Sequence, residues 1–324
     1  MQAKVHSPTS SNLRRLAKAL RRGELVAIPT ETVYGLAAHA LDTRACQAIY
    51  KAKGRPANDP LIVHVLGLAQ AEQLAEFNPT ARKLARRFWP GPLTLVLPRK
   101  SCVPDIVTSG GPTVALRAPA HPLARRLLRL ARIPLAAPSA NLFGYISPTQ
   151  PAHVMDGLGR RIRHVLDGGM CRVGVESTIL DLTDPAKPKI LRPGAVTADA
   201  LEKILARPIG QVRQGNNRKR MPAPGMMERH YSPHTTLRLK SPGRRLPHDV
   251  GGIFIRKPAG PTGRNIYWLS LRGAMVEVSR NLYRVLRQAD RVGHREIWVE
   301  SGPHGAGGLA AAVHDRLKRA AAKR

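Results

Sequence analysis

Short apolar runs recur along this chain of 324 residues, and most of them end in small polar or cationic side chains. Leu25–Ile28 runs into a Pro-Thr-Glu-Thr turn, and Val114–Leu116 is followed at once by Arg117. Glycine and proline, 28 residues each, interrupt the pattern throughout, which favours many short elements over a bundle of long helices. The alternation of strand and helix patterns predicts an α/β fold with a twisted mixed sheet covered by helices.

The expected elements of the first two thirds of the chain follow from hydrophobic periodicity and capping residues. Strands are expected at Leu25–Ile28, Leu61–Val65, Leu93–Leu97, Thr113–Leu116, Arg163–Leu166, Thr178–Leu182 and Lys189–Leu191. Helices are expected at Ser11–Arg22 with Ser11 or Asn12 as cap, from Asn78 to near Trp89, at Pro122–Ala131, and after Thr197. A helix-like segment is expected between the Pro-Thr-Glu-Thr turn and Lys53.

The pattern breaks between Pro208 and His234, where glycine, proline and charged residues replace any apolar face. This segment is interpreted as a linker. Strand and helix patterns resume after it, with strands at 235–239, 252–255, 265–269 and 296–300 and helices at 278–288 and 306–322. The sequence therefore predicts a catalytic domain over 1–207, a linker over 208–234 and a smaller α/β domain over 235–324.

The chain is strongly basic, with 53 Lys and Arg against 21 Asp and Glu and a formal net charge of +32. Such a surface attracts polyanions, although the basic residues are spread along the whole chain. An RNA-binding or ribosome-assembly protein is the alternative function, but an RNA binder should interleave aromatic residues with its cations. Four Phe, six Tyr and three Trp argue against that alternative.

Cysteine usage and hydropathy point to the cytoplasm. The three cysteines are widely separated and form no Cys-x-x-Cys pair, so neither a disulfide framework nor a zinc site is indicated. The chain has no run approaching ~18 apolar residues, so we expect no membrane-spanning helix.

Lys53-Gly54-Arg55-Pro56 places two cations around a glycine and is expected to form a rigid exposed bend. It would bind phosphate or carboxylate, or would simply be a solvated helix end, and the motif alone favours neither. Ser139 and Asn141 would present a hydroxyl and an amide to a ligand, or would cap a turn. His64 lies in an apolar strand, where a buried core histidine is the alternative interpretation.

The sequence has no Ser-His-Asp spacing, carboxylate pair or P-loop. Several strand ends rich in hydroxyls and cations would line one positive site without an evident nucleophile. This combination indicates catalysis by positioning and charge stabilisation.

The ordered motifs PTETVYGL, KAKGRP, PLIVH, FWPGPLTLVL, VALRAP, APSAN, SPT, GVESTILD and LRPG resemble the YrdC/Sua5 family over nearly the whole chain. PGMMERHYSP is similar to the signature that separates the full-length Sua5 type from single-domain members. The resemblance implies a YrdC-like sheet around a basic cavity and a Rossmann-like C-terminal domain. It also implies synthesis of threonylcarbamoyl-AMP and pyrophosphate from L-threonine, bicarbonate and ATP, with Mg²⁺ accompanying ATP. A partner complex would transfer the threonylcarbamoyl group to adenosine 37 of ANN-decoding tRNAs, and a weak contact with tRNA is a further expectation.

The resemblance also implies the roles of particular residues. The threonine contacts would be Thr32, His64, Arg117, Ala137 and Ser177. The ATP contacts would be Lys53, Arg55, Asp59, Thr113, Ser139, Asn141, Ser147, Arg192 and Tyr231, with Lys53 and Arg55 stabilising phosphate charge. Many relatives have Asn where this chain has Asp59, which would have to face Mg²⁺ or point away from the triphosphate. His230 and Tyr231 would belong to a lid formed by the linker. No residue is expected to bind a metal directly.

Overall fold

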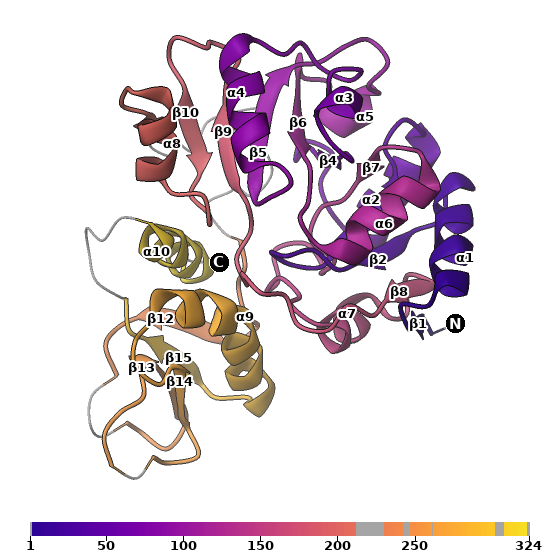
Figure 1. The fold of residues 1–324 in the computed structure, drawn as a ribbon. Coiled ribbons are helices and arrows are strands. Elements are labelled where there is room, and N and C mark those ends of the chain that lie inside the picture. Colours follow the sequence, from indigo (N-terminus) through magenta and orange to yellow (C-terminus); the bar gives the residue numbers. More distant parts are fainter. Residues whose placement is uncertain (1, 212–229, 243–245, 261, 302–307, 323–324) are drawn as a thin grey trace.

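The computed structural model describes residues 2–211, 230–242, 246–260, 262–301 and 308–322. Its strands form two separate sheets, one of eleven strands and one of four (Figure 1). The large sheet has the order β1-β8-β2-β3-β7-β4-β6-β5-β9-β10-β11 and mixes parallel with antiparallel pairs. The expected α/β class with a mixed sheet is confirmed.

The first unit contains the large sheet and eight helices among the described residues. Its strands are β1 (Lys4–His6), β2 (Val26–Ile28), β3 (Gly35–His39), β4 (Ile62–His64), β5 (Leu93–Pro98), β6 (Thr113–Arg117), β7 (Leu135–Ala136), β8 (His164–Leu166), β9 (Thr178–Asp181), β10 (Lys189–Arg192) and β11 (Gly210–Gln211). Its helices are α1 (Ser10–Arg21), α2 (Thr43–Lys53), α3 (Leu68–Ala71), α4 (Pro79–Phe88), α5 (Asp105–Thr108), α6 (Pro122–Ala131), α7 (Pro151–Leu158) and α8 (Ala198–Leu205).

Strand pairing brings distant motifs together at the middle of the large sheet. β4 and β6 are parallel, and their register sets His64 opposite Arg117. β7 joins β4 to β3 through antiparallel pairs, so the segment that follows β7 returns beside the end of β2. An isolated bridge between Gly35 and Ser139 extends this contact. Residues from four separate parts of the sequence therefore lie around one point.

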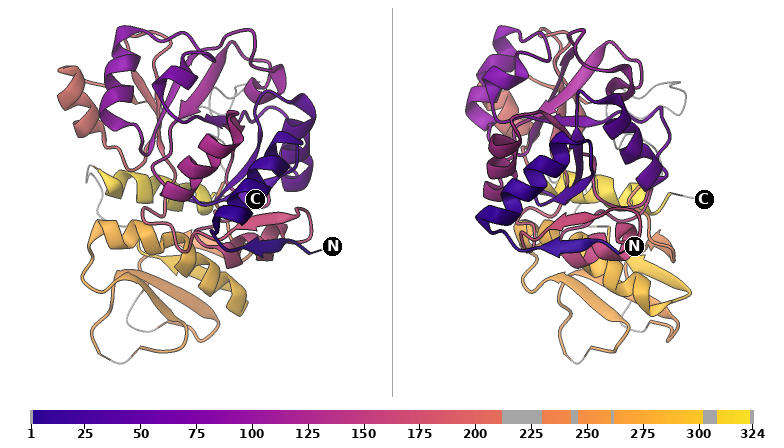
Figure 2. Two further views of the ribbon diagram at one scale, coloured as in Figure 1. Left: turned by 45° about the vertical axis from the view of Figure 1, so that its right-hand side comes forward. Right: turned by 90° about the vertical axis from the view of Figure 1, so that its right-hand side faces the viewer.

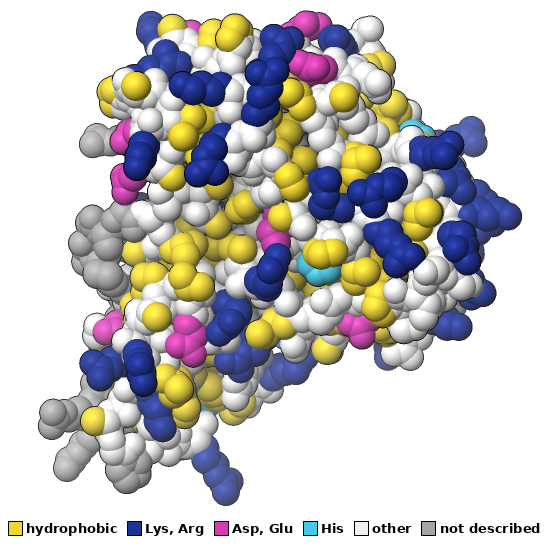
Figure 3. All heavy atoms as spheres, in the orientation of Figure 1, with side chains coloured by type: hydrophobic (Ala, Val, Ile, Leu, Met, Phe, Trp, Pro, Cys, Tyr) yellow, Lys and Arg dark blue, Asp and Glu magenta, His cyan; other side chains and the backbone are white. Residues whose placement is uncertain are grey.

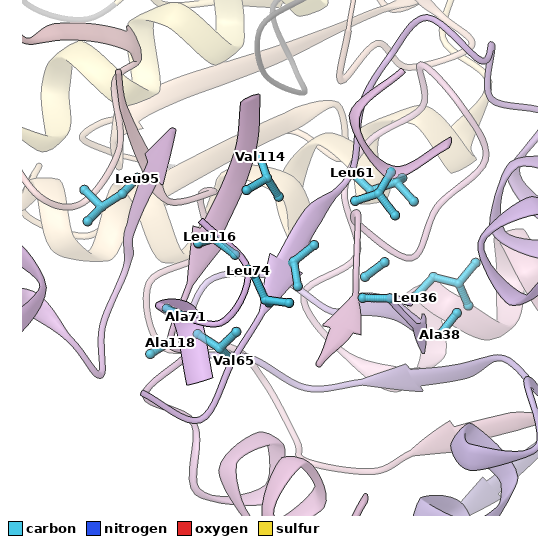
Figure 4. Close-up of a cluster of buried hydrophobic side chains, with 14 of the residues drawn as sticks. Leu36, Ala38, Leu61, Val65, Ala71, Leu74, Leu95, Val114, Leu116 and Ala118 are labelled. Carbon is cyan, nitrogen blue, oxygen red and sulfur yellow. The ribbon is translucent and has the colours of Figure 1, made fainter. Parts of the chain in front are cut away.

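The main apolar core packs against this sheet, and Figure 4 shows part of it. Leu36 and Ala38 of β3, Leu116 of β6 and Leu61 before β4 are all almost fully buried. Leucine, valine and alanine fill this core, and burying each large side chain stabilises the fold by about 1.5–3 kcal/mol. The strands that carry the site therefore rest on a packed apolar layer.

Capping residues explain several helix boundaries. Asn78 caps α4 through a 2.8 Å bond from the Ala81 amide to its side chain, and Thr197 caps α8, as predicted. The predicted cap of α1 is wrong, because Thr9 rather than Ser11 or Asn12 accepts the amide of Asn12 at 3.2 Å. Thr9 has extended backbone angles, which a capping residue needs.

The segment after the Pro-Thr-Glu-Thr turn begins as a strand, which corrects the expected helix. β3 precedes α2 there, and four of its five residues are buried. A strand buried on both faces shows no alternation of polar and apolar residues, so its period is hidden in the sequence. The helical pattern holds only from Thr43 onward.

The second unit is a parallel sheet of order β12-β15-β13-β14, formed by β12 (Thr236–Leu239), β13 (Val250–Arg256), β14 (Ile266–Ser270) and β15 (Glu296–Val299). Helices α9 (Met275–Val292) and α10 (Leu309–Ala320) lie between this sheet and the first unit (Figures 1 and 2). The expected smaller α/β unit is confirmed.

The contact between the two units is close and partly polar. Gly174 of the first unit touches the backbone of α9 so closely that an added Cβ would lie 2.4 Å from Cα of Arg280. Asp290 of α9 accepts a hydrogen bond from the Tyr145 hydroxyl at 2.7 Å. The two units are thus in direct backbone and side-chain contact. No helix in the described part of the chain is both long and apolar enough to cross a membrane.

Candidate functional site

A narrow cleft opens to solvent where β2, β4, β6 and β7 end. Its walls come from the turn after β2, the ends of β4 and β6, the segment after β7, the GVEST turn before β9, the end of β10 and the start of the second unit. The lining residues are Thr30, Thr32, Val33, Gly35, Arg55, Ile62, His64, Arg117, Ala137, Pro138, Ser139, Glu176, Ser177, Arg192, His230 and Tyr231. All five residues expected to contact threonine are among them.

Arg117 is tied into the Pro-Thr-Glu-Thr turn. Its Nη2 donates to Oε1 of Glu31 at 2.6 Å, and its Nη1 donates to Oγ1 of Thr32 at 2.9 Å. The backbone amide of Ala120 donates to Oε2 of the same glutamate at 3.0 Å. Burial opposes ionisation of Glu31, but the Arg117 guanidinium holds the pKa of that carboxyl below its usual value. The arginine is thus partly neutralised and held in place before any substrate carboxylate reaches it.

Two further groups complete this side of the cleft. Oγ1 of Thr30 lies 2.8 Å from Oγ1 of Thr32 and donates to the carbonyl of Val33 at 2.6 Å, which fixes the turn. Burial and the nearby Arg117 lower the pKa of His64 to about 3, so its imidazole is neutral at physiological pH. A neutral ring next to an arginine can donate or accept a hydrogen bond without adding charge.

Ser177 and Arg192 form another part of the cleft wall. Oγ of Ser177 lies 2.8 Å from Oγ1 of Thr94, and Nη2 of Arg192 donates to the carbonyl of Ser177 at 3.1 Å and to its hydroxyl at 3.2 Å. The chain after β10 passes so close that a Cβ on Gly194 would lie 2.3 Å from the amide nitrogen of Thr178. Only glycine fits there, so β10 and the chain that follows it lie tightly against the GVEST turn.

The expected exposed bend at Lys53-Gly54-Arg55 is wrong. Lys53 is the last residue of α2 and is 2% exposed, and Gly54 ends the helix in the left-handed conformation with φ 62°. Nζ of Lys53 donates to the carbonyls of Ser139 at 2.5 Å and Asn141 at 2.6 Å. Burial and the neighbouring Arg55 lower the pKa of Lys53 well below its usual value. Lys53 thus holds the Ser139–Asn141 segment in place. Arg55, in contrast, lines the cleft itself.

Asp59 does not line the cleft. It is fully buried and its Oδ2 lies 2.9 Å from Nη2 of Arg55. Burial raises the pKa of this carboxyl, while Arg55, Lys53 and Arg192 act in the opposite direction. The guanidinium of Arg55 is also held by the carbonyls of Asp59 and Pro60. Asp59 is therefore the counter-ion that orients Arg55.

The other residues expected on the nucleotide side differ in their exposure to the cleft. Ser139 lines it, whereas Asn141, Ser147 and Thr113 do not. The amide of Asn141 donates to the carbonyls of Leu142 and Tyr145 and so shapes the loop, and Ser147 donates to Oε1 of Glu176 at 2.6 Å. Thr113 begins β6, at the opposite end of that strand from Arg117.

The end of the expected linker enters the cleft wall. His230 and Tyr231 are buried, their rings are 4.1 Å apart, and Tyr231 has a positive φ of 62°. Most of the lid expected over 208–234, namely residues 212–229, lies outside the described residues. The described part of that segment places an aromatic pair against Ser139 and Arg192 in the same cleft.

Two carboxylates of the site were not singled out in the sequence. Glu31 and Glu176 lie within the Pro-Thr-Glu-Thr and GVEST motifs, where neighbouring hydroxyl residues carried the expectation. Burial alone would raise the pKa of Glu176, but Arg316 and Arg192 lower it to about 2. A lone acidic residue inside an apolar-flanked turn of a chain with 53 cationic residues is the signal that could have pointed to such pairs.

The described residues offer no group of three or more His, Cys, Asp or Glu arranged to hold a metal ion. The three carboxylates in or beside the cleft, Glu31, Asp59 and Glu176, are each paired with an arginine. Within the described ranges these pairs therefore leave no carboxylate set that fits Mg²⁺, which prefers several oxygen ligands in octahedral geometry.

Stability is expected to fall as the pH drops below about 6.5, because three buried histidines resist protonation. Burial lowers the pKa of His64, His153 and His230 to about 3 from 6.5. Between pH 6.5 and pH 3 the unfolded chain binds protons that the folded chain does not. Each of these histidines therefore lowers the free energy of unfolding by up to about 1.4 kcal/mol for every pH unit of acidification. Denaturant unfolding measured from pH 8 to pH 5 should show this slope. His153→Gln, outside the cleft lining, should make the slope shallower; an unchanged slope would contradict the assignment.

Comparison with known proteins places this chain in a family. Residues 18–194 match the Sua5–YciO–YrdC family, described as "Telomere recombination", and residues 196–322 match "Threonylcarbamoyl-AMP synthase, C-terminal domain". The chain therefore belongs to the Sua5–YciO–YrdC family, in its two-domain form.

Particular relatives match the chain over its whole length. The threonylcarbamoyl-AMP synthase of Pyrococcus abyssi is 41% identical over 96% of this chain and 94% of its own length. That of Bacillus subtilis is 40% identical over 98% and 95%, respectively. The solved structure of P. abyssi Sua5 complexed with L-threonine has a TM-score of 0.89 at 38% identity and covers 98% of each chain. Escherichia coli YciO, at 21% identity and a TM-score of 0.53, shares the fold of the first unit.

Proposed function

We propose that this chain is a threonylcarbamoyl-AMP synthase that uses L-threonine, bicarbonate and ATP. The observation that carries the proposal is a single cleft that combines the Arg117–Thr32–His64 side with the Arg55–Ser139–Arg192 side. Full-length relatives at 40–41% identity carry the name of this enzyme, and one of them is similar in structure and was solved with L-threonine.

The reaction needs no nucleophile from the protein. The ammonium group of threonine first loses a proton, and the resulting amine condenses with bicarbonate, with loss of water, to give a carbamate. A carbamate oxygen then attacks the α-phosphorus of ATP, and the bond to the β-phosphate oxygen breaks to release pyrophosphate. The protein must hold two anions side by side and stabilise the charge that develops on the phosphates.

The residues divide this work between the two sides of the cleft. Arg117 and Thr32 would bind the carboxylate and hydroxyl of threonine, with His64, Ser177 and the backbone of Ala137 beside them. Arg55 and Arg192 supply fixed positive charge for the phosphates, since arginine pairs with phosphate oxygens through several N–H groups. Lys53 supports the nucleotide side through the Ser139 and Asn141 carbonyls that it holds. The remaining residues expected on the nucleotide side are Ser147, Thr113, Asp59 and Tyr231.

Mg²⁺ is expected as a companion of ATP, but the described residues do not form a site for it. The proposal therefore assigns no residue to the metal. The transfer of the product to tRNA by a partner complex, and a weak contact of the basic surface with tRNA, are further parts of this proposal. Lys and Arg side chains are spread over the face shown in Figure 3 rather than gathered in one place.

The test is pyrophosphate release by the purified full-length chain supplied with ATP and MgCl₂. We expect release to require both L-threonine and bicarbonate, and the adenylate product to appear in equal amount by mass spectrometry. Omission of threonine from the same mixture is the control. No release, or release that is equal without threonine, would refute the proposed activity and would leave an RNA-binding function to be tested with labelled RNA.

A further inference from the structure

The second unit reaches the cleft through one carboxylate. Glu176 lies in the GVEST turn of the first unit and lines the cleft. Its Oε2 accepts a hydrogen bond from the Tyr283 hydroxyl of α9 at 2.9 Å and from Nε of Arg316 of α10 at 2.7 Å. Both donors belong to the second unit, so this contact joins α9 and α10 to a residue of the cleft wall.

The two donors are buried as deeply as any core residue. Arg316 is 1% exposed and Tyr283 is fully buried. The Tyr231 ring, which lines the cleft, stacks on Tyr283 with 5.7 Å between ring centroids, and Cζ of Arg316 lies 5.2 Å from the Tyr231 centroid. The second unit therefore forms the layer directly behind one wall of the cleft.

The same carboxylate holds a residue of the nucleotide side. Oε1 of Glu176 accepts the Ser147 hydroxyl at 2.6 Å, so the chain of contacts runs from Arg316 through Glu176 to Ser147. Ser147 is fully buried, and a buried hydroxyl with one strong acceptor has a fixed orientation. A shift of the carboxylate would release Ser147 as well.

Glu176 poses an electrostatic problem for a cleft that takes a triphosphate. A carboxylate on the lining repels phosphate, and burial strengthens that repulsion because the surroundings screen it poorly. Arg316 lies against this carboxylate and offsets its charge, so that the positive potential of Arg55 and Arg192 dominates. Asp315 accepts from Nη1 of Arg316 at 2.7 Å and also pairs with Arg319.

We propose that Arg316 and Tyr283 are positioning residues of the nucleotide side of the cleft. They hold the Glu176 carboxylate in place and offset its charge, so that Ser147 stays oriented and the phosphates meet no net repulsion. This inference rests on the proposed function, because ATP supplies the phosphates. It assigns the second unit a direct part in binding ATP.

The proposal predicts a specific pattern among variants. Arg316→Met removes the ion-pair partner of Glu176, so KM for ATP should rise at least about tenfold, while KM for threonine changes less than about threefold. Glu176→Gln/Arg316→Met removes both charges and keeps an acceptor for Ser147, so KM for ATP should return to within about threefold of the wild type. Tyr283→Phe keeps the ring stack with Tyr231 but removes one donor, and should raise KM for ATP a few-fold.

The experiment uses the full chain and measures both KM values, kcat and the melting temperature for each variant. Arg291→Met is the matched control, because Arg291 of α9 also forms an ion pair across the two units, with Asp156, but its side chain is 58% exposed and lies away from the cleft lining. Binding of a non-hydrolysable ATP analogue, measured by calorimetry without threonine, provides a readout independent of turnover. The control should match the wild type in both assays.

Several outcomes would overturn the proposal. One is a double variant whose KM for ATP stays as high as that of Arg316→Met; another is equal changes in the two KM values; a third is a Tyr283→Phe variant that binds the analogue as tightly as the wild type. If Arg316→Met does not fold, the double variant and Tyr283→Phe decide the question. A wild-type chain that binds the analogue but releases no pyrophosphate would instead refute the proposed function.

Discussion

Replacing Arg117 with methionine is expected to lower kcat/KM for threonine by about 30- to 4,000-fold, since a buried charge-assisted contact costs about 2–5 kcal/mol when one partner is truncated. The same change leaves the Glu31 carboxylate buried without its guanidinium partner, which lies 2.6 Å away in the wild type. The variant should therefore also lose about 3–5 kcal/mol of unfolding free energy. Steady-state pyrophosphate release and denaturant unfolding measure the two effects separately.

The double variant Glu31→Gln/Arg117→Met separates the two roles of this arginine. Removing both charges should restore most of the stability, because no uncompensated carboxylate remains in the protein interior. Activity should stay as low as in Arg117→Met, because the cation for the substrate carboxylate is still missing. Recovery of activity together with stability would show that Arg117 acts only as a structural partner of Glu31.

Replacing Arg55 with alanine is expected to have the second large effect. Asp59 is fully buried, and Arg55 is its ion-pair partner at 2.9 Å. Removal of the Arg55 guanidinium should therefore lower the free energy of unfolding by about 3–5 kcal/mol. Loss of a phosphate-facing cation should also reduce pyrophosphate release by at least about 10²-fold. Calorimetric melting and the pyrophosphate assay are the measurements.

Arg55→Ala/Asp59→Asn serves as the matched variant for this prediction. Asparagine at position 59 removes the buried charge, so the melting temperature should recover while activity does not. The single variant Asp59→Asn should remain active, because Arg55 is still held by the carbonyls of Asp59 and Pro60. An inactive Asp59→Asn variant with a normal melting temperature would contradict the role of Asp59 as a mere orienting counter-ion.

The sequence was most informative where local chemistry determines structure. Asn78 before Pro79 and Thr197 before an apolar helix marked helix starts that the structure confirms. Alternation of apolar runs with turn residues also predicted both α/β units. β3 was missed because a strand buried on both faces carries no alternating pattern, and the cap of α1 was misplaced by two or three residues because several hydroxyl residues adjoin it.

The candidate site shows a similar limit. Ordered motifs pointed to residues that the fold brings into one cleft, including Thr32, Arg117 and Ser177. The sequence did not predict which site residues are buried or which charged residues form ion pairs, because both depend on contacts between segments far apart in the sequence. Lys53 was expected in an exposed bend and is instead buried against the Ser139 and Asn141 carbonyls. The Arg316 contact with Glu176 joins residues 140 positions apart.

The close approach of Gly174 to α9 limits how this protein could be recombined with its relatives. A hybrid joined within the segment that connects the two units would pack the α9 helix of a relative directly against the backbone of Gly174. A Cβ at Gly174 would already lie 2.4 Å from the Arg280 backbone, so even small differences in helix placement would clash. Exchange of the second unit is therefore expected to succeed only if the GVEST turn is exchanged with it.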